Sequence, residues 1–174
     1  MTSRTTFPAM LAALALGALP AKAQEPRPVE ITPYIAVGTA GAAPVGIAVT
    51  VPITATLSAE TEVGYSPGAA RLHALSSSIS LLLFLPRIGQ VTPYVAGGVG
   101  VSQYGAPVLR LDGPPIGTVK RLAFTVNAGA GLMFPVSSSL ELRTDARYFS
   151  SLGQGSDQFR IAQGISFDVG KRKQ

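Results

Sequence analysis

Two stretches of this chain carry charge only on alternate residues, and this pattern constrains the fold more than any other feature. Residues 57–65 read LSAETEVGY and residues 140–148 read LELRTDARY. Successive side chains on a β-strand point to opposite faces, so each stretch predicts a strand with one ionic face and one apolar or neutral face. In a water-soluble sandwich the ions would face solvent. In a membrane barrel they would fill the lumen, and the apolar face would meet lipid.

The first 23 residues predict a cleavable secretory signal. Arg4 supplies the positive start, the run from Phe7 to Leu19 is apolar, and Ala21-Lys22-Ala23 fits an A-x-A cleavage site. The alternative is a membrane-anchoring helix, but the run is shorter than the ~20 apolar residues that span a bilayer. We therefore expect a signal peptide at 1–23, one barrel domain at 24–170 and a basic tail at 171–174.

Composition favours the membrane reading of the alternating strands. Mean hydropathy is +0.34 and only 13% of residues are charged, although no apolar run after Ala23 is long enough for a spanning helix. A barrel wall explains both facts, because its hydrophobicity lies in alternation. The chain has no cysteine, so closure of a sheet in the bilayer would replace disulfides as a source of stability. The basic excess lies largely in the signal and in Lys171–Lys173, which argues against a nucleic-acid partner.

Turn residues divide the rest of the chain into eight segments. The connections Pro52–Ala55, Pro86–Gln90 and Pro135–Ser138 are short, whereas Tyr104–Thr118, with Gly-Pro-Pro at 113–115, is the longest. Short turns at one end and longer loops at the other are typical of an outer-membrane barrel with both termini in the periplasm. The expected strands are Val29–Gly38, Val45–Val51, Thr56–Ser66, Arg71–Leu85, Val91–Gln103, Val119–Phe134, Ser139–Ser150 and Asp157–Val169.

The chain also repeats itself. Thr32-Pro33-Tyr34 recurs 60 residues later as Thr92-Pro93-Tyr94. Residues 51–53 and 57–65 match residues 134–136 and 140–148 at an offset of 83. A four-strand half used twice fits an even-numbered up-and-down barrel; chance similarity between short strands is the alternative.

Side-chain size also separates the two faces of the expected strands. Bulky residues such as Ile79, Val99 and Val126 share one parity, and Ser78, Gly100 and Thr125 share the other. A soluble β-core needs bulky residues inside because protein interiors are close-packed. The bulky parity therefore predicts a lipid-facing wall around a narrow lumen. Aromatic residues at the two membrane interfaces would be Tyr65, Tyr148, Phe134 and Phe167.

With Pro-Tyr-(Ile/Val)-Ala at 33–36 and 93–96, and with residues 127–135 running through a turn into 140–148, the chain resembles the small outer-membrane β-barrel family of OmpA-like and opacity-type proteins. The resemblance implies an eight-stranded barrel in the outer membrane of a Gram-negative cell, with a structural, adhesive or resistance role. A few related barrels are lipid-A-modifying enzymes. Members usually end on an aromatic residue, whereas Val169 here is followed by Gly-Lys-Arg-Lys-Gln.

The inward parity carries most of the charge, and opposite charges there should pair across the lumen, because an unpaired buried charge is strongly unfavourable. A proton or ion path is the alternative use of the same residues. The third and seventh strands are the most charged and stand opposite each other in an eight-membered ring. The predicted lumen network comprises Glu60, Glu62, Glu141, Arg143, Asp145, Arg147, Arg121, Arg160 and Asp168.

His73 is the only histidine. A Ser–His hydrolase would need it, but by parity it faces away from Ser76 and Ser78, so we assign it no catalytic role. One histidine and no cysteine predict no zinc site, and the glycine runs lack a phosphate-loop lysine, so no cofactor is expected.

We therefore predict an all-β, eight-stranded antiparallel up-and-down transmembrane barrel without enzymatic activity and with a filled lumen. Its partners would be outer-membrane lipid and an extracellular partner at loop 104–118. The alternatives are a membrane-embedded lipid-modifying hydrolase and a soluble periplasmic barrel that binds an apolar ligand.

Overall fold

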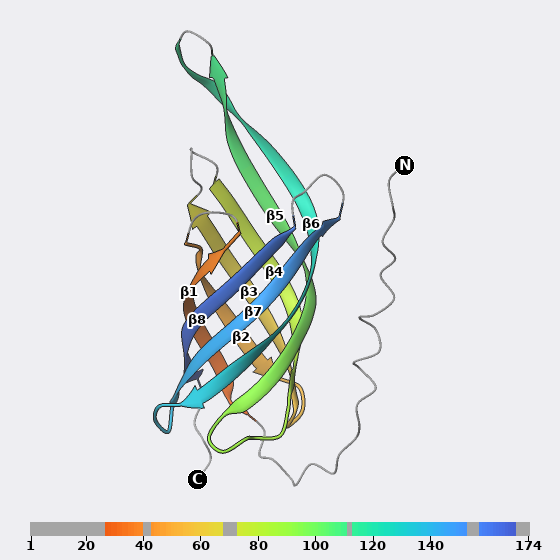
Figure 1. Ribbon diagram of the computed structural model, residues 1–174, viewed down its shortest axis with the longest axis vertical. Helices are drawn as coiled ribbons and strands as arrows, with labels where there is room; N and C mark the ends of the chain where they lie inside the picture. The colour runs from red at the N-terminus through yellow and green to blue at the C-terminus, as the bar shows by residue number, and fades with distance from the viewer. Residues whose placement is uncertain (1–26, 40–42, 68–72, 111–112, 153–156, 170–174) are drawn as a thin grey trace.

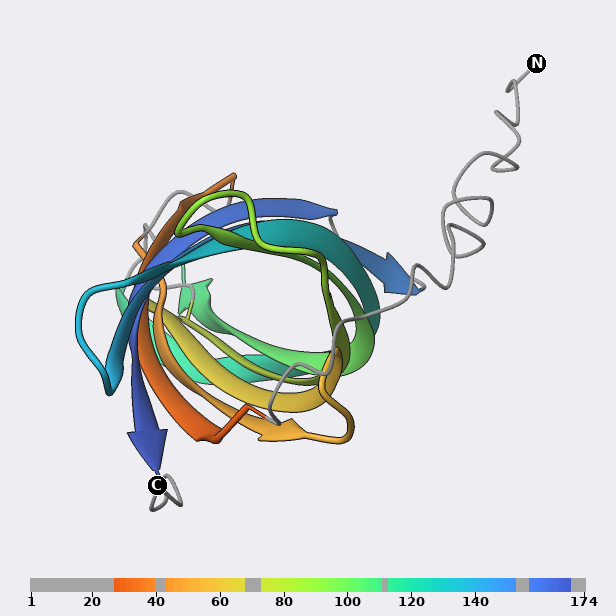
Figure 2. The same ribbon diagram turned by 90° about the horizontal axis from the view of Figure 1, so that it is seen from below.

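In a computed structural model of the 174-residue chain, the described residues are 27–39, 43–67, 73–110, 113–152 and 157–169. They form eight antiparallel strands, and β1 pairs with β8, so that the sheet closes into an up-and-down barrel (Figures 1 and 2). The predicted fold class is confirmed. The strands are β1 Val29–Gly38, β2 Val45–Pro52, β3 Leu57–Pro67, β4 His73–Phe84, β5 Thr92–Arg110, β6 Gly113–Pro135, β7 Leu140–Leu152 and β8 Gln158–Val169.

The predicted signal peptide (1–23) and basic tail (171–174) lie outside the described residues. Within the described part of the chain, no helix is long and apolar enough to cross a membrane.

Two of the short connections are built in the same way. In the β2–β3 turn the Ile53 N–H donates to the Leu57 carbonyl at 2.8 Å, and in the β6–β7 turn the Val136 N–H donates to the Leu140 carbonyl at 2.9 Å. Ile53 and Val136 are 83 residues apart, and so are Leu57 and Leu140, which is the offset that relates the two repeated sequence segments. The repeat seen in the sequence is therefore also a repeat of backbone geometry.

The segment Tyr104–Thr118, which we expected to be a loop, is instead mostly strand. β5 continues to Arg110 and β6 begins at Gly113, with Pro107 opposite Thr118 and a register shift between Val108 and Arg110. The glycines and prolines suggested a break, but proline is tolerated where a strand has an unpaired edge, and this hairpin extends beyond its neighbours. Figure 1 shows β5 and β6 rising together above the rim of the other strands.

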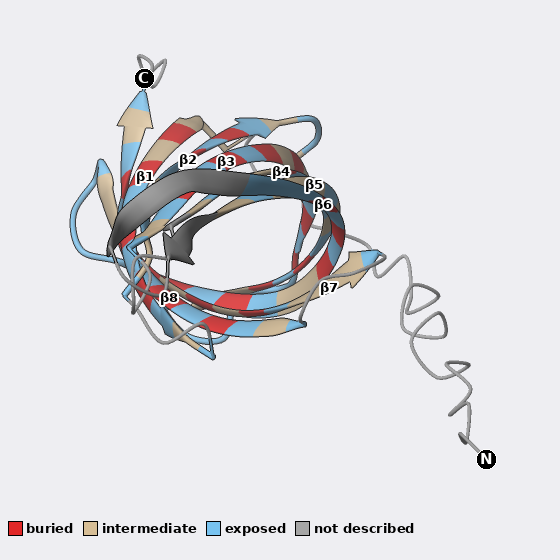
Figure 3. Ribbon diagram, turned by 90° about the horizontal axis from the view of Figure 1, so that it is seen from above, coloured by how far each residue is buried: buried red, intermediate tan, exposed pale blue. Residues whose placement is uncertain are grey.

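Burial alternates along the strands, as Figure 3 shows from above. The bulky parity points outward and is exposed: Ile79 and Val99 are each 61% accessible. The opposite parity is buried in the lumen and includes Ala48, Thr125 and Ser166. The outer apolar surface also includes Val45, Ile47, Val49, Leu75, Leu81, Leu122, Phe124, Ile161 and Ile165.

Candidate functional site

Six ionised side chains meet across the lumen, and we call them the central ion cluster. They come from three strands and are nearly inaccessible to solvent. β3 supplies two carboxylates, β7 supplies two guanidiniums and a carboxylate, and β8 supplies the third guanidinium. The cluster consists of Glu60, Glu62, Arg143, Asp145, Arg147 and Arg160.

Glu60 is the acceptor at the centre of this cluster. Arg143 pairs with both of its oxygens, Arg147 donates to Oε1 at 2.6 Å, and the Thr50 hydroxyl donates to Oε2 at 3.0 Å. Arg143 and Arg147 also donate to Asp145 Oδ2 at 3.1 and 3.3 Å. The pairing crosses the lumen between β3 and β7, because eight strands leave an interior just wide enough for side chains to meet.

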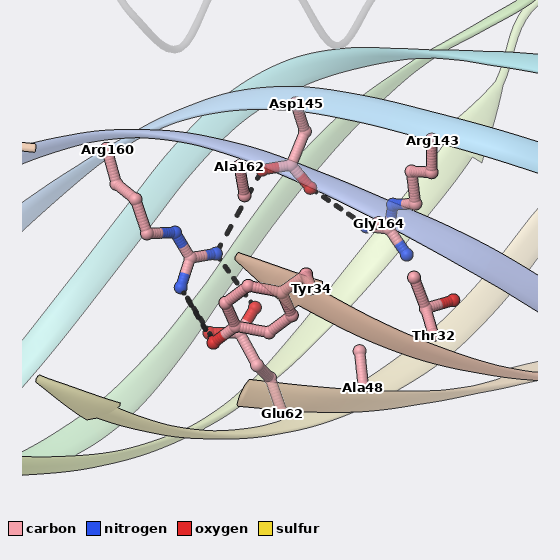
Figure 4. A pocket seen from close by; sticks show the side chains of 9 residues that line it. All are labelled: Thr32, Tyr34, Ala48, Glu62, Arg143, Asp145, Arg160, Ala162 and Gly164. Carbon is pink, nitrogen blue, oxygen red and sulfur yellow. Dashed lines mark hydrogen bonds and ion pairs between the residues drawn. The ribbon is translucent and has the colours of Figure 1, made fainter. Parts of the chain in front are cut away.

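A second bidentate pair joins β8 to β3. Arg160 Nη1 and Nη2 donate to the two oxygens of Glu62 at 2.5 and 2.8 Å, and Nη2 lies 4.0 Å from Asp145 Oδ1 (Figure 4). Arg147 Nη1 lies 3.9 Å from Glu62 Oε2, so the two pairs form one network.

Two tyrosines complete the network. The Tyr34 hydroxyl donates to Glu62 at 3.0 Å and accepts from Arg160 at 3.2 Å. The Tyr94 hydroxyl donates to Asp145 at 3.0 Å and accepts from Arg143 Nε at 2.7 Å. In each case the guanidinium carbon also lies 4.9 Å from the tyrosine ring centroid, a cation–π distance.

Each of these rings covers a glycine on the neighbouring strand. Tyr34 is in register with Gly46, and Tyr94 is in register with Gly131. A Cβ at either glycine would overlap the tyrosine ring. Glycine is required at these two positions because the ring occupies the space above the backbone.

Three guanidiniums face three carboxylates, so the central ion cluster has no net charge. Beside Asp145, Arg143 and Arg160 a cavity of about 10 Å³ remains, room for about one water. Asp145 Oδ1 and Arg160 Nε are buried without a hydrogen-bond partner, and such a water would serve them. The arrangement is a plug of mutually neutralised charge. It can hold the wall in register by joining β3, β7 and β8 across the lumen.

Comparison with solved structures identifies this arrangement of strands. The N-terminal β-barrel domain of Pseudomonas aeruginosa OprF superposes with a TM-score of 0.62 at 17% identity, covering 82% of this chain and 98% of that one. Neisserial surface protein A gives a TM-score of 0.60 at 11% identity, covering 81% and 94%. The fold is that of an eight-stranded outer-membrane β-barrel.

Other barrels of this fold include an enzyme. The outer membrane enzyme PagL superposes with a TM-score of 0.52 at 14% identity, covering 80% of this chain and 99% of that one. No family model matches the sequence, and no curated protein matches it. These likenesses therefore establish the fold and leave the activity open.

The predicted interface aromatics lie on the outer face of the barrel. Tyr65 and Tyr148 are 42% and 38% exposed near the ends of their strands, and the Tyr148 hydroxyl donates to Asp157 at 2.5 Å. Phe167 is exposed and Phe134 half-buried near the short turns. The two pairs are at opposite ends of the wall, as aromatic girdles require.

Glu141 lies in a separate ion group near the turn end of the barrel. Arg27, just before β1, donates to Glu141 at 2.6 Å and to Glu30 at 3.0 Å, and its guanidinium carbon lies 4.3 Å from the Phe84 ring centroid. Arg27 was not among the predicted site residues, although its spacing to Glu30 was a usable signal. The hydroxyls of Tyr34 and Tyr94 were not predicted either, although the Thr-Pro-Tyr repeat marked both residues.

The two remaining members of the predicted network stand apart from the central ion cluster. Arg121 has the inward parity of Ala123 and Thr125 but is exposed, because it lies where β6 rises above the rim. Asp168 is half-buried and in register with Glu30 at the turn end. The side chain of His73 is outside the described part of the structure; its backbone opens β4 opposite Gly105.

Proposed function

We propose that this barrel resides in the outer membrane of a Gram-negative cell, where it has a structural or surface-interaction role and does not conduct ions. One observation carries the proposal: bulky apolar side chains cover the outside, while paired ions fill the inside. A wall of Val, Ile and Leu exposed to water would promote aggregation, whereas lipid solvates it. The predicted signal peptide supports the same location.

The filled lumen supports a non-conducting role. The central ion cluster spans the interior from β3 to β7 and β8, and the cavity beside it has room for about one water. An ion would have to break several buried ion pairs to pass, and leaving a buried charge unpaired costs about 3–5 kcal/mol. In planar bilayers the purified barrel should therefore show no single-channel steps at neutral pH.

The distribution of polarity disfavours the soluble alternative. A periplasmic carrier of apolar ligands needs an open apolar interior. The described lumen instead holds the buried ions, hydroxyls and glycines together with one small apolar cluster, whose members pack against each other: Leu82, Phe84, Tyr94, Ala96 and Met133. The hydrolase alternative rests on the shared fold with an outer membrane enzyme and on His73, and it is tested separately below.

A charge placed on the outer wall tests the membrane assignment. Val99 is exposed on the outer face of β5, between Ile79 and Val126 on the adjacent strands. Val99→Arg should disfavour insertion into lipid vesicles by about 2–4 kcal/mol, the value for arginine near the bilayer midplane. Val136→Arg is the matched control, because Val136 is exposed in the β6–β7 turn. Equal insertion of the wild type and both variants would reject the proposal.

A further inference from the structure

The loop end of the barrel contains a second cavity, of about 50 Å³, above the central ion cluster. We call it the loop-end cup. Its floor is formed by Tyr34 and Arg160, and its walls come from β3 to β8. The wall residues used below are Ser66, Ser102, Tyr104, Thr125, Phe149 and Gln158.

The wall of the loop-end cup carries several hydroxyls, and three of them make no hydrogen bond to the described residues. Among the described residues, no hydrogen bond engages the hydroxyl of Ser66, Ser102 or Thr125. The Tyr104 hydroxyl accepts from Gln158 at 3.1 Å and retains its own proton for a further bond. Several donor–acceptor groups that face one small space are suited to a ligand that carries several hydroxyls.

Aromatic rings lie beside these hydroxyls. Tyr104 and Phe149 both line the loop-end cup, and Phe149 is held by Arg160, whose guanidinium carbon lies 5.0 Å from its centroid. Rings beside hydroxyls match the two kinds of surface on a sugar ring, which has C–H faces and a polar edge. The volume corresponds to a few waters at about 10–15 Å³ each, so a single ring, rather than a chain, would replace them.

A cation stands above this cup. Arg121 is in register with Tyr104, and residues directly opposite on neighbouring strands share a face of the sheet. Arg121 is exposed and, within the described residues, makes no ion pair. Arg160 is different, because Glu62 occupies both of its Nη atoms. The described lining contains no carboxylate that would repel an anion.

We propose that the loop-end cup binds the terminal ring of an acidic carbohydrate of the uronate class. The hydroxyls of the ring would bond to Ser66, Ser102 and Thr125, and its carboxylate would pair with Arg121, the residue type suited to bidentate carboxylate binding. This inference rests on the proposed function, since the loop end must face outside the cell to meet glycans.

Titration of the folded barrel in detergent micelles tests this inference, with amide chemical shifts as the readout. Glucuronate, glucose and inorganic phosphate are the probes. Glucuronate should bind most tightly and shift the amides of Ser102, Tyr104 and Gln158. Arg121→Gln should weaken glucuronate binding about tenfold and leave glucose unchanged. Tyr104→Ala should weaken both sugars, and Arg87→Gln, a matched change at an exposed arginine of the β4–β5 turn, should alter neither.

Phosphate binding as tight as glucuronate binding, or an Arg121→Gln variant with unchanged glucuronate affinity, would overturn the inference. If binding holds, lipopolysaccharide with and without acidic core sugars, added to the micelles, shows whether the sugar comes from the same membrane or from another source. The micelle assay does not depend on where the barrel resides. Failure here therefore leaves the membrane assignment standing, and failure of vesicle insertion leaves sugar affinity measurable.

Discussion

Glu60 and Arg143 are 83 residues apart in the chain and form a two-pronged ion pair across the lumen. Their separation equals the offset that relates residues 57–65 to residues 140–148. The two residues therefore occupy equivalent positions in the two halves of the barrel, with a carboxylate in one and a guanidinium in the other.

Tyr34 and Tyr94 show the same duplication. Each is the last residue of a Thr-Pro-Tyr segment, and its ring covers a glycine on a neighbouring strand. Each hydroxyl donates to a carboxylate and accepts from an arginine. The repetition favours two related halves over chance similarity, because the contacts recur together with the letters.

Removing one partner of a buried bidentate ion pair should destabilise the barrel more than replacing both partners with apolar residues. Glu62→Ala leaves the Arg160 guanidinium buried without its partner and should lower the free energy of unfolding by about 3–5 kcal/mol. The double variant Glu62→Leu with Arg160→Met should cost much less, since no charge is left unpaired. Urea unfolding in lipid vesicles, followed by circular dichroism, measures both. A double variant that loses as much free energy of unfolding as Glu62→Ala, or more, would contradict this prediction.

Gly131 should not tolerate a methyl group. A Cβ there would overlap the ring of Tyr94 and force it from its contacts, so Gly131→Ala should destabilise the barrel by about 1–3 kcal/mol, as overpacking does. Gly97→Ala is the control, because its Cβ would meet only the Asn127 carbonyl oxygen at 3.8 Å. The same unfolding assay applies, and equal effects of the two variants would show that the ring does not fix this position.

Asp157 gives the loop end a pH dependence. The Tyr148 hydroxyl and then the backbone N–H of Ser151 and the hydroxyl of Ser150 donate to its carboxylate, which holds the pKa of Asp157 below its ordinary value. A lowered pKa means that these bonds stabilise the folded form above about pH 4 and are lost as the pH falls through the folded pKa. NMR titration should show Tyr148→Phe raising the pKa of Asp157. An unchanged pKa would assign the shift to the other two donors.

His73→Ala distinguishes the barrel from a hydrolase. The variant should migrate on gels as a heat-modifiable barrel, as the wild type should, and should show the same response in assays of lipid deacylation. Loss of a deacylase activity in a folded His73→Ala variant would make the enzyme alternative the better one.

The sequence predicted those features that depend on alternation. The strand pattern, the closed ring and the outward direction of residues such as Val99 and Phe124 follow from period-two patterning, because a one-residue error would place the bulky side chains in the lumen. The partners of Glu60 also followed, since β3 and β7 must face each other in an eight-stranded ring.

Features that depend on contacts between strands could not be predicted from the alternation within one strand. The glycines and prolines of 104–118 resemble a loop until two strands pair and satisfy the backbone of the hairpin. Arg121 has the right parity for the lumen but lies near the loop end of β6, above the rim of the barrel. Parity predicts the face of a strand and does not predict the position of a residue along the barrel axis. Arg27 precedes any strand, so alternation did not mark it.

The charge of the central ion cluster also determines which half-barrels can combine. The first four strands bring Glu60 and Glu62, a charge of minus two, and the last four bring Arg143, Asp145, Arg147 and Arg160, a charge of plus two. Two copies of the first half would enclose four carboxylates, and two copies of the second would enclose a surplus of guanidiniums. Each half thus has only the other as an electrically neutral complement. Because the repeated segments carry opposite net charge, a symmetric dimer of either half would bury ions without partners, whereas the single closed chain neutralises them.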